Sequence, residues 1–167
     1  MDNKKLVFTE SVAEDIYELA NNLRADDVRE CQASGYTSHR ALLEAFTYSD
    51  ICYSAKVNGH TEAMFGVSNY NQPQGYGLVW YLGSDVSFEF PIQLVKKGRE
   101  YVQEWLKEFN VLYNVVDERN TQHIEWLKHI EFTFSGEVII NGYKFLQFFK
   151  VKEFSQPTSK LVSETTN

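Results

Sequence analysis

The sequence predicts a single α/β (α+β) domain built on a mixed sheet of about seven strands, flanked by about four helices. Three observations predict this class. Two Asn-Gly dipeptides each lie between strand-like runs, an apolar run follows a long amphipathic helix, and the 167 residues include 12 Phe, 10 Tyr and 3 Trp. Aromatic residues are enriched in strands and supply bulky core side chains. We expect residues 1–153 to form the domain and residues 154–167 to form a flexible polar tail.

The first part of the chain reads as a short strand followed by helices. Leu6–Thr9 is strand-like, and a helix follows with Val12, Ile16, Leu19 and Leu23 on one face. Ser11 and Glu14 have the spacing of a capping box at its start. A second helical region covers residues 25–32, is interrupted at Gly35 and continues over residues 38–46. These elements place one strand and a set of helices before the main sheet.

Strands dominate the next segment. Residues 51–57 and 61–67 flank Asn58-Gly59, a dipeptide that tolerates the positive φ of a tight turn. This pattern predicts an antiparallel hairpin. A loop over residues 69–77 then leads to a third strand, residues 78–82, in the same sheet.

The C-terminal half alternates helices and strands. Pro91 begins a long helix that we expect to end near Phe109, with Gly98 allowing close approach to the sheet. The apolar run 111–116 is typical of a buried parallel strand, and a helix over residues 121–130, capped by Asn120, follows it. Residues 132–140 and 143–151 flank the second Asn-Gly turn and predict a closing hairpin.

Composition narrows the class of partner. The formal net charge of −7 disfavours a general phosphate-binding surface, so we expect no nucleic-acid partner. No apolar run approaches the roughly 20 residues of a membrane-spanning helix, and no signal-peptide core follows Met1, so no membrane span is expected. Cys31 and Cys52 are too few for a disulfide framework and fit a reduced, cytosolic setting.

The order of elements resembles that of the GCN5-related N-acetyltransferases (GNAT) over residues 1–151. In that family a buried strand leads to an Asn, then to a helix, and then usually to Gly-Phe. Asn120 matches the Asn and Phe132 matches the Phe, whereas Glu131 replaces the Gly. The resemblance implies an acetyltransferase-like fold.

A narrower group shares more of the same region. The chain is similar to the small internal virion proteins of T7-like phages at Tyr113-Asn114-Val115, Asn120-Thr121, His123-Ile124, Leu127-Lys128, Tyr81–Asp85 and the Tyr143–Phe149 hairpin. This similarity implies a phage protein that is made in the host cytosol and resides there or in the virion.

The family's acetyl-CoA loop is poorly matched. That loop, Q/R-x-x-G-x-G/A, lies between the fourth strand and the long helix, where main-chain amides hold the pyrophosphate. Gln72–Gly77 fits the pattern, but a strand follows it, so we read it as an ordinary hairpin loop. The expected position holds Ser84–Pro91, which has no glycine and would place Asp85 and Glu89 against the pyrophosphate. Like charge at this point disfavours the cofactor.

Catalytic residues are also hard to assign, and we assign none. In the family, the helix after the Asn often supplies a Tyr that acts as general acid. In this sequence, the residue eight positions after Asn120 is Lys128. Glu62 and Asp117 are conceivable general bases, although carboxylates at strand ends are more often solvated. We expect no metal site, because His123 and His129 are six residues apart and more often face solvent or a partner.

These observations predict a phage internal virion or virion-assembly protein that acts by protein–protein contact, with no cofactor and with other phage or host proteins as partners. One alternative is an active N-acetyltransferase that transfers an acetyl group from acetyl-CoA to an amine. In that case the resemblance assigns cofactor contacts to Leu82 and Asn120. A second alternative is a host-targeted inhibitor whose acidic surface imitates another polyanion.

Overall fold

Seven strands form one mixed sheet in the order β1-β2-β3-β4-β5-β7-β6 in the computed structural model, which describes residues 4–153. The strands are β1 (Val7–Glu10), β2 (Ile51–Val57), β3 (His60–Ser68), β4 (Tyr76–Gly83), β5 (Val111–Asp117), β6 (Thr133–Ile140) and β7 (Tyr143–Val151). Only the β4–β5 pair is parallel, and the other five pairs are antiparallel. The predicted seven-stranded mixed sheet is confirmed.

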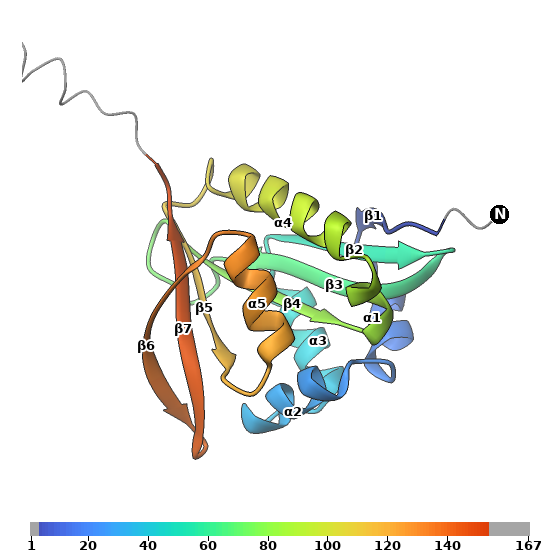
Figure 1. Ribbon diagram of the computed structural model, residues 1–167, viewed down its shortest axis with the longest axis horizontal. Helices are drawn as coiled ribbons and strands as arrows, with labels where there is room; N and C mark the ends of the chain where they lie inside the picture. The colour runs from blue at the N-terminus through green and yellow to red at the C-terminus, as the bar shows by residue number, and fades with distance from the viewer. Residues whose placement is uncertain (1–3, 154–167) are drawn as a thin grey trace, which may run out of the picture.

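Helices cover both faces of this sheet (Figure 1). They are α1 (Ala13–Ala20), α2 (Ala25–Ala33), α3 (Ser38–Tyr48), α4 (Pro91–Trp105) and α5 (Thr121–His129), with a short 3₁₀ helix, η1 (Asp85–Glu89), between β4 and α4. The region around Gly35 is therefore two separate helices. Among residues 4–153, no helix is both long and apolar enough to span a bilayer.

Two apolar clusters fix the two layers of helices. The larger lies between the sheet and α4 and α5, and includes Phe65, Tyr81, Trp105, Leu112 and Phe148. The smaller lies on the opposite face, where Ile16, Leu19 and Leu42 of α1 and α3 pack against Met64 and Leu82. Successive residues of a strand point to opposite faces, so the two neighbours Tyr81 and Leu82 belong to different clusters.

Both predicted hairpins form. Asn58 and Gly59 have φ values of +50° and +81°, and Asn141 and Gly142 have +50° and +82°. Two consecutive positive φ values are the requirement of the turn that matches the twist of a two-residue hairpin. The segment Gln72–Gly77, which matches the acetyl-CoA loop pattern, leads directly into β4 and joins it to the antiparallel strand β3. It is therefore a hairpin loop, as expected.

Three local predictions were wrong. Helix α1 is capped at Val12, whose amide donates to Oδ2 of Asp15, while Ser11 hydrogen-bonds Ser54 of β2 instead. Helix α4 ends at Trp105, although Phe109 is still buried. A Cβ on Gly98 would lie 2.8 Å from Cγ2 of Ile130, so this glycine permits close approach to α5 and its C-terminal turn rather than to the sheet. The expected tail lies outside the described residues.

Candidate functional site

The candidate site is the crevice where the parallel strands β4 and β5 separate. They pair only at Tyr76–Val111, Gly77–Leu112 and Leu78–Tyr113, after which both strands continue without facing each other. In open α/β sheets, ligands bind in crevices at the carboxyl ends of parallel strands. The run 111–116 that the sequence marks as a parallel strand therefore forms one wall of the candidate site.

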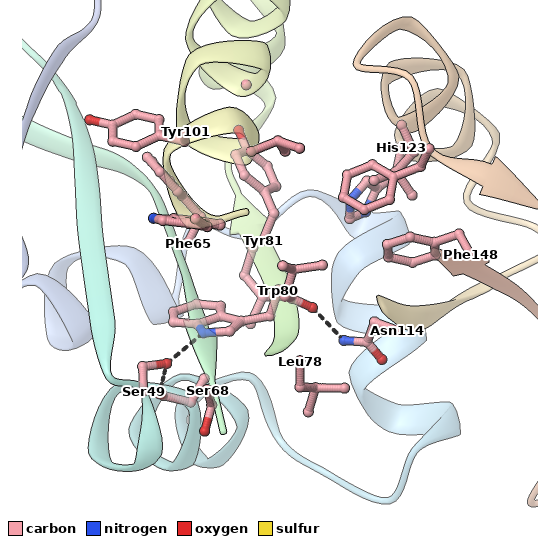
Figure 2. A pocket seen from close by; sticks show the side chains of 18 of the residues that line it. Ser49, Phe65, Ser68, Leu78, Trp80, Tyr81, Tyr101, Asn114, His123 and Phe148 are labelled. Carbon is pink, nitrogen blue, oxygen red and sulfur yellow. Dashed lines mark hydrogen bonds between the residues drawn. The ribbon is translucent and has the colours of Figure 1, made fainter. Parts of the chain in front are cut away.

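Asn114 bridges the two strands at the point of separation. Its Nδ2 donates to the carbonyl oxygen of Val79 at 2.6 Å, and its Oδ1 accepts from the amide of Val115 at 2.7 Å (Figure 2). The side chain thus satisfies a β4 carbonyl that has lost its strand partner. A ligand that paired with β4 at this point would have to displace Asn114.

Beyond Asn114 the crevice widens into a cavity of about 530 Å³ that passes from one face of the sheet to the other. We call its two halves the α3 side and the α5 side. The α3 side is lined by Tyr48, Tyr70, Leu78 and Trp80, and the α5 side by Val79, Tyr81, His123, Trp126, Leu127 and Phe148. A volume of this size is within the range of small-molecule sites, roughly 300–1,000 Å³.

The α3 side has an aromatic entrance held by hydrogen bonds. Nε1 of Trp80 donates to Oγ of Ser49 at 2.7 Å, and Oγ of Ser68 donates to the carbonyl oxygen of Tyr48 at 2.6 Å (Figure 2). The rings of Tyr48 and Tyr70 stack with centroids 4.1 Å apart while remaining exposed. Trp80, which is half-buried, therefore forms a wall of the cavity.

Four aromatic rings from three elements meet on the α5 side. Tyr81 of β4 lies 4.7 Å from Trp126, 5.7 Å from His123 and 5.9 Å from Phe88, measured between ring centroids. Nε1 of Trp126 donates to the carbonyl oxygen of Leu94 and ties α5 to α4. These rings narrow the passage between β4, η1 and α5.

His123 is buried, so the prediction that it faces solvent or a partner was wrong. Its Nδ1 is one of two buried side-chain polar atoms without a hydrogen bond among the described residues, the other being the Tyr81 hydroxyl, which lies beside Ser87. Burial, together with the nearby charge of Arg24, lowers the pKa of His123 to about 3. The ring is therefore neutral at pH 7. His129, in contrast, is exposed as expected.

The turn between β4 and α4 is occupied by the protein's own groups. The amide of Gly83 donates to Oδ2 of the buried Asp27 at 3.0 Å, and the Ser87 amide bonds the carbonyl oxygen of Ser84 at 3.2 Å. A 3₁₀ helix, η1, fills the remainder and exposes Asp85 and Glu89. The amide of Ser84 likewise donates to the carbonyl oxygen of Glu62 at 2.8 Å. This region thus presents carboxylates outward and uses three of its amides internally.

Asn120, the first residue expected to contact a cofactor, belongs to a buried polar cluster with Arg24 and Asp27. Arg24 donates to Asp27 at 3.0 Å and to Oδ1 of Asn120 at 3.3 Å, and Nδ2 of Asn120 donates to Asp27 at 2.9 Å. The Arg24 guanidinium also lies 4.5 Å from the ring centroid of Phe88. Asn120 sits at the start of α5, but its side chain makes no capping bond there. The cluster instead connects α2 to the start of α5 through hydrogen bonds, and to η1 through the contact of Arg24 with Phe88.

Leu82, the second expected cofactor contact, lies at the wall of the cavity but points away from the α5 side. Its side chain packs with Leu19, Leu42 and Met64, and its backbone pairs with Met64 of β3. The structure therefore does not bring Leu82 and Asn120 together around a shared opening on one face of the sheet.

The two proposed bases are buried and paired rather than solvated. Glu62 accepts from Nδ1 of His60 at 2.8 Å and from the Ser84 hydroxyl. Asp117 accepts two hydrogen bonds from the Arg119 side chain; burial acts to raise its pKa, but these bonds outweigh burial and lower it. Both carboxylates are thus engaged in hydrogen bonds with neighbouring side chains of the protein.

Glu30 is a carboxyl group that the sequence analysis missed. It lines the cavity from α2, and its Oε1 accepts from the amide of Asp117 at 2.7 Å. Burial, and then the neighbouring charges of Asp27 and Asp117, raise its pKa to about 8. No local pattern marks this residue, because Asp117 is 87 positions away in the chain.

No metal centre can be assigned: within residues 4–153, no group of three or more His, Cys, Asp or Glu side chains is arranged to hold an ion. Cys31 and Cys52 are both free thiols. Burial raises the pKa of Cys31 to about 12 and that of Cys52 to about 11, so neither is an activated nucleophile at neutral pH.

Comparison with known proteins identifies the fold. No protein-family model and no curated protein matches the sequence. Among solved structures, a GNAT-family acetyltransferase from Bacillus anthracis matches with a TM-score of 0.67 and 9% identity over 92% of this chain and 99% of that one. The Escherichia coli ribosomal-protein-S18-alanine N-acetyltransferase gives 0.64 and 8%, over 92% and 98%. The aminoglycoside acetyltransferase AAC(6')-Ib with coenzyme A gives 0.63 and 12%, over 98% and 100%. The chain therefore has the fold of the GNAT acetyltransferases.

Proposed function

We propose that this protein uses a GNAT-like scaffold for protein–protein contact, as an internal virion or virion-assembly protein of a T7-like phage, and that it does not bind acetyl-CoA. The observation that carries the second part is the hydrogen bond from the Gly83 amide to the buried Asp27. In the family that the fold resembles, amides of this turn hold the pyrophosphate. Here a carboxylate of the protein takes the amide just before this turn, and the carbonyl oxygen of Glu62 takes the Ser84 amide at 2.8 Å.

Three further features of the turn support the absence of acetyl-CoA. Residues 84–90 contain no glycine, so Cβ atoms stand where the backbone would need to approach a phosphate. Asp85 and Glu89 are exposed there and would repel a diphosphate. Arg24, a cation close to this turn, is buried against Asp27, Asn120 and Phe88, so its guanidinium is already engaged by groups of the protein.

The role in contact with other proteins draws on the exposed aromatic and apolar side chains and on the similarity of residues 113–132 to small internal virion proteins. Tyr17 is 68% exposed and Tyr70 is 53% exposed, and Ile92, on the first turn of α4, is 83% exposed. Aromatic side chains are enriched in protein–protein interfaces, where they bury a large area for few rotatable bonds. Partners would be other phage or host proteins.

Calorimetric titration with acetyl-CoA tests the cofactor part, with AAC(6')-Ib as the positive control. We expect no saturable binding up to millimolar concentration, and a micromolar Kd would overturn this part. Mass spectrometry of purified phage particles tests the virion part. Recovery of the chain from particles supports it, whereas recovery only in host complexes from infected cells favours the host-targeted inhibitor.

A second candidate function, N-acetyl transfer to an amine, is favoured by one observation, the raised pKa of Glu30 in the cavity. A carboxyl group with a pKa near the working pH is suited, in its ionised form, to accept the proton that an ammonium group must lose before its nitrogen can attack. This candidate requires labelled acetyl to move from acetyl-CoA to a polyamine or peptide amine. It also requires Glu30→Gln to abolish that transfer while Glu44→Gln, a second carboxyl group of the same cavity, leaves it intact.

A further inference from the structure

The α5 side of the cavity contains a buried acceptor or donor that the protein itself leaves unused. Nδ1 of His123 is buried and has no hydrogen-bond partner among the described residues, although its side chain lines the cavity. Nearly all buried polar groups of native proteins are hydrogen-bonded, because an unpaired one costs roughly 1–3 kcal/mol. An unpaired buried group that faces a cavity indicates a missing partner.

The surroundings of this atom are apolar and carry no free charge. Val79, Leu94, Val102, Leu127 and Phe148 line this part of the cavity. Lys97, a cation on the lining, pairs with Glu100 at 3.2 Å, and the buried Arg24 pairs with Asp27 at 3.0 Å. Transfer of an unpaired charge into such a place is costly, so a charged occupant is disfavoured.

The chemistry of the ring defines the polar group of the occupant. Neutral histidine has one N–H donor and one acceptor nitrogen, and which nitrogen holds the proton follows from its partners. A hydroxyl or an amide can donate or accept and therefore suits either tautomer. The Tyr81 and His123 rings are in edge contact, with centroids 5.7 Å apart, so an apolar occupant would lie beside this pair of rings rather than between them (Figure 2).

We propose that the α5 side of the cavity binds a small uncharged molecule with an apolar ring or chain and a single hydroxyl or amide group, which hydrogen-bonds Nδ1 of His123. This proposal rests on the proposed function, because it needs a crevice that coenzyme A does not occupy. It assigns the cavity a ligand of about the size of one aromatic side chain rather than a nucleotide.

Phenol and toluene are matched probes for this site, because they have the same ring and differ in the hydroxyl group. We expect phenol to raise the melting temperature of the full chain and to bind about tenfold more tightly than toluene, the effect of a hydrogen bond of roughly 1.4 kcal/mol. In His123→Phe, which keeps a ring but has no nitrogen, phenol should lose its preference over toluene, because its hydroxyl group then has no partner. The control His129→Phe, on the exposed face of the same helix, should keep the preference for phenol.

Crystals soaked with 4-iodophenol locate the ligand independently of affinity. An anomalous iodine peak between β4 and α5 is expected, and a peak confined to the α3 side would overturn the proposal. Failure of phenol to bind, or an unchanged preference for phenol in His123→Phe, would overturn it as well. Titration with acetyl-CoA is a separate arm: binding of that cofactor contradicts the proposed function, whereas failure of phenol alone contradicts only this inference.

Discussion

The amide of Gly83 at the end of β4 donates to Oδ2 of Asp27 in α2 at 3.0 Å, and Asp27 is fully buried. Through this bond an internal carboxylate occupies the amide immediately before the turn that leads into α4. Arg24 neutralises the carboxylate from one side and Asn120 donates to it from another. The turn is therefore closed by the same cluster that joins α2 to α5.

Removing the charge of Asp27 should destabilise the whole domain. In Asp27→Asn the buried Arg24 guanidinium loses its closest carboxylate partner and is left with the half-exposed Asp26 at 3.6 Å, and breaking a buried ion pair from one side costs about 3 kcal/mol or more. The free energy of unfolding in urea measures the loss. Asp26→Asn is the matched control, because Asp26 lies at the surface and should change stability by less than about 1 kcal/mol. Equal effects of the two changes would contradict the role assigned to the cluster.

Replacing His123 by Phe should stabilise the protein and change its response to acid. The pKa of His123 is about 3 in the folded state, below its ordinary value of 6.5, so the unfolded chain takes up the proton first. Stability therefore falls as the pH drops below about 6.5, by about 1.4 kcal/mol per pH unit. In the wild type, this loss of stability amounts to roughly 3 kcal/mol between pH 6.5 and 4.5. In His123→Phe, this part of the loss should be absent.

Urea unfolding at pH 7 and pH 4.5 measures the difference, with His129→Phe as the control that retains the buried histidine. The account is wrong if both variants show the same decline in stability on acidification. It is also wrong if His123→Phe is less stable than the wild type at pH 7, because an apolar ring of similar shape should fill the site without an unpaired nitrogen.

Glu30 should produce the opposite dependence on pH. Its pKa is raised to about 8 from 4.5, so between these values the folded state holds a proton that the unfolded state has released. Stability from this group is present at low pH and is lost as the pH rises through this range. Glu30→Gln should remove the decline and be more stable than the wild type at pH 8. Glu44→Gln, whose carboxylate pairs with Arg40 at the surface, is expected to follow the wild type in urea unfolding at pH 5.5 and pH 8.

Gly98→Ala should be destabilising even though alanine favours helices by about 1 kcal/mol over glycine. The added Cβ would lie 2.8 Å from Cγ2 of Ile130 and 3.3 Å from Trp126. Overpacking of this kind typically costs roughly 1–3 kcal/mol. Thermal unfolding measures the loss, and the double change Gly98→Ala with Ile130→Ala should recover part of the helix gain. An increase in melting temperature for Gly98→Ala alone would show that α4 and α5 are less tightly packed than the structure indicates.

The fold could be predicted because its signals are local. Each hairpin is predicted by two adjacent residues, the Asn-Gly of its turn. Pro91 predicts the start of the long helix, and the apolar run 111–116 predicts the parallel strand beside the crevice. The absence of glycine between residues 84 and 90 is equally local, so the altered turn was visible in the sequence.

The side-chain contacts around the crevice could not be predicted, because they join residues that are far apart in the sequence. Asp27 reaches Gly83 across 56 positions and Asn120 across 93. His123 stands four residues before the buried Leu127 of α5, and the ring that packs against it from outside this helix, Tyr81, comes from the distant strand β4. Similarly, the high pKa of Glu30 arises from burial and then from the charges of Asp27 and Asp117, and no pattern within α2 indicates that burial.

Calorimetric titration of the full chain with acetyl-CoA is the most direct test of the central claim that Asp27 and η1 close the pyrophosphate turn. For the wild type, we expect no saturable heat up to millimolar cofactor. A micromolar Kd with a stoichiometry near one cofactor per chain would contradict it.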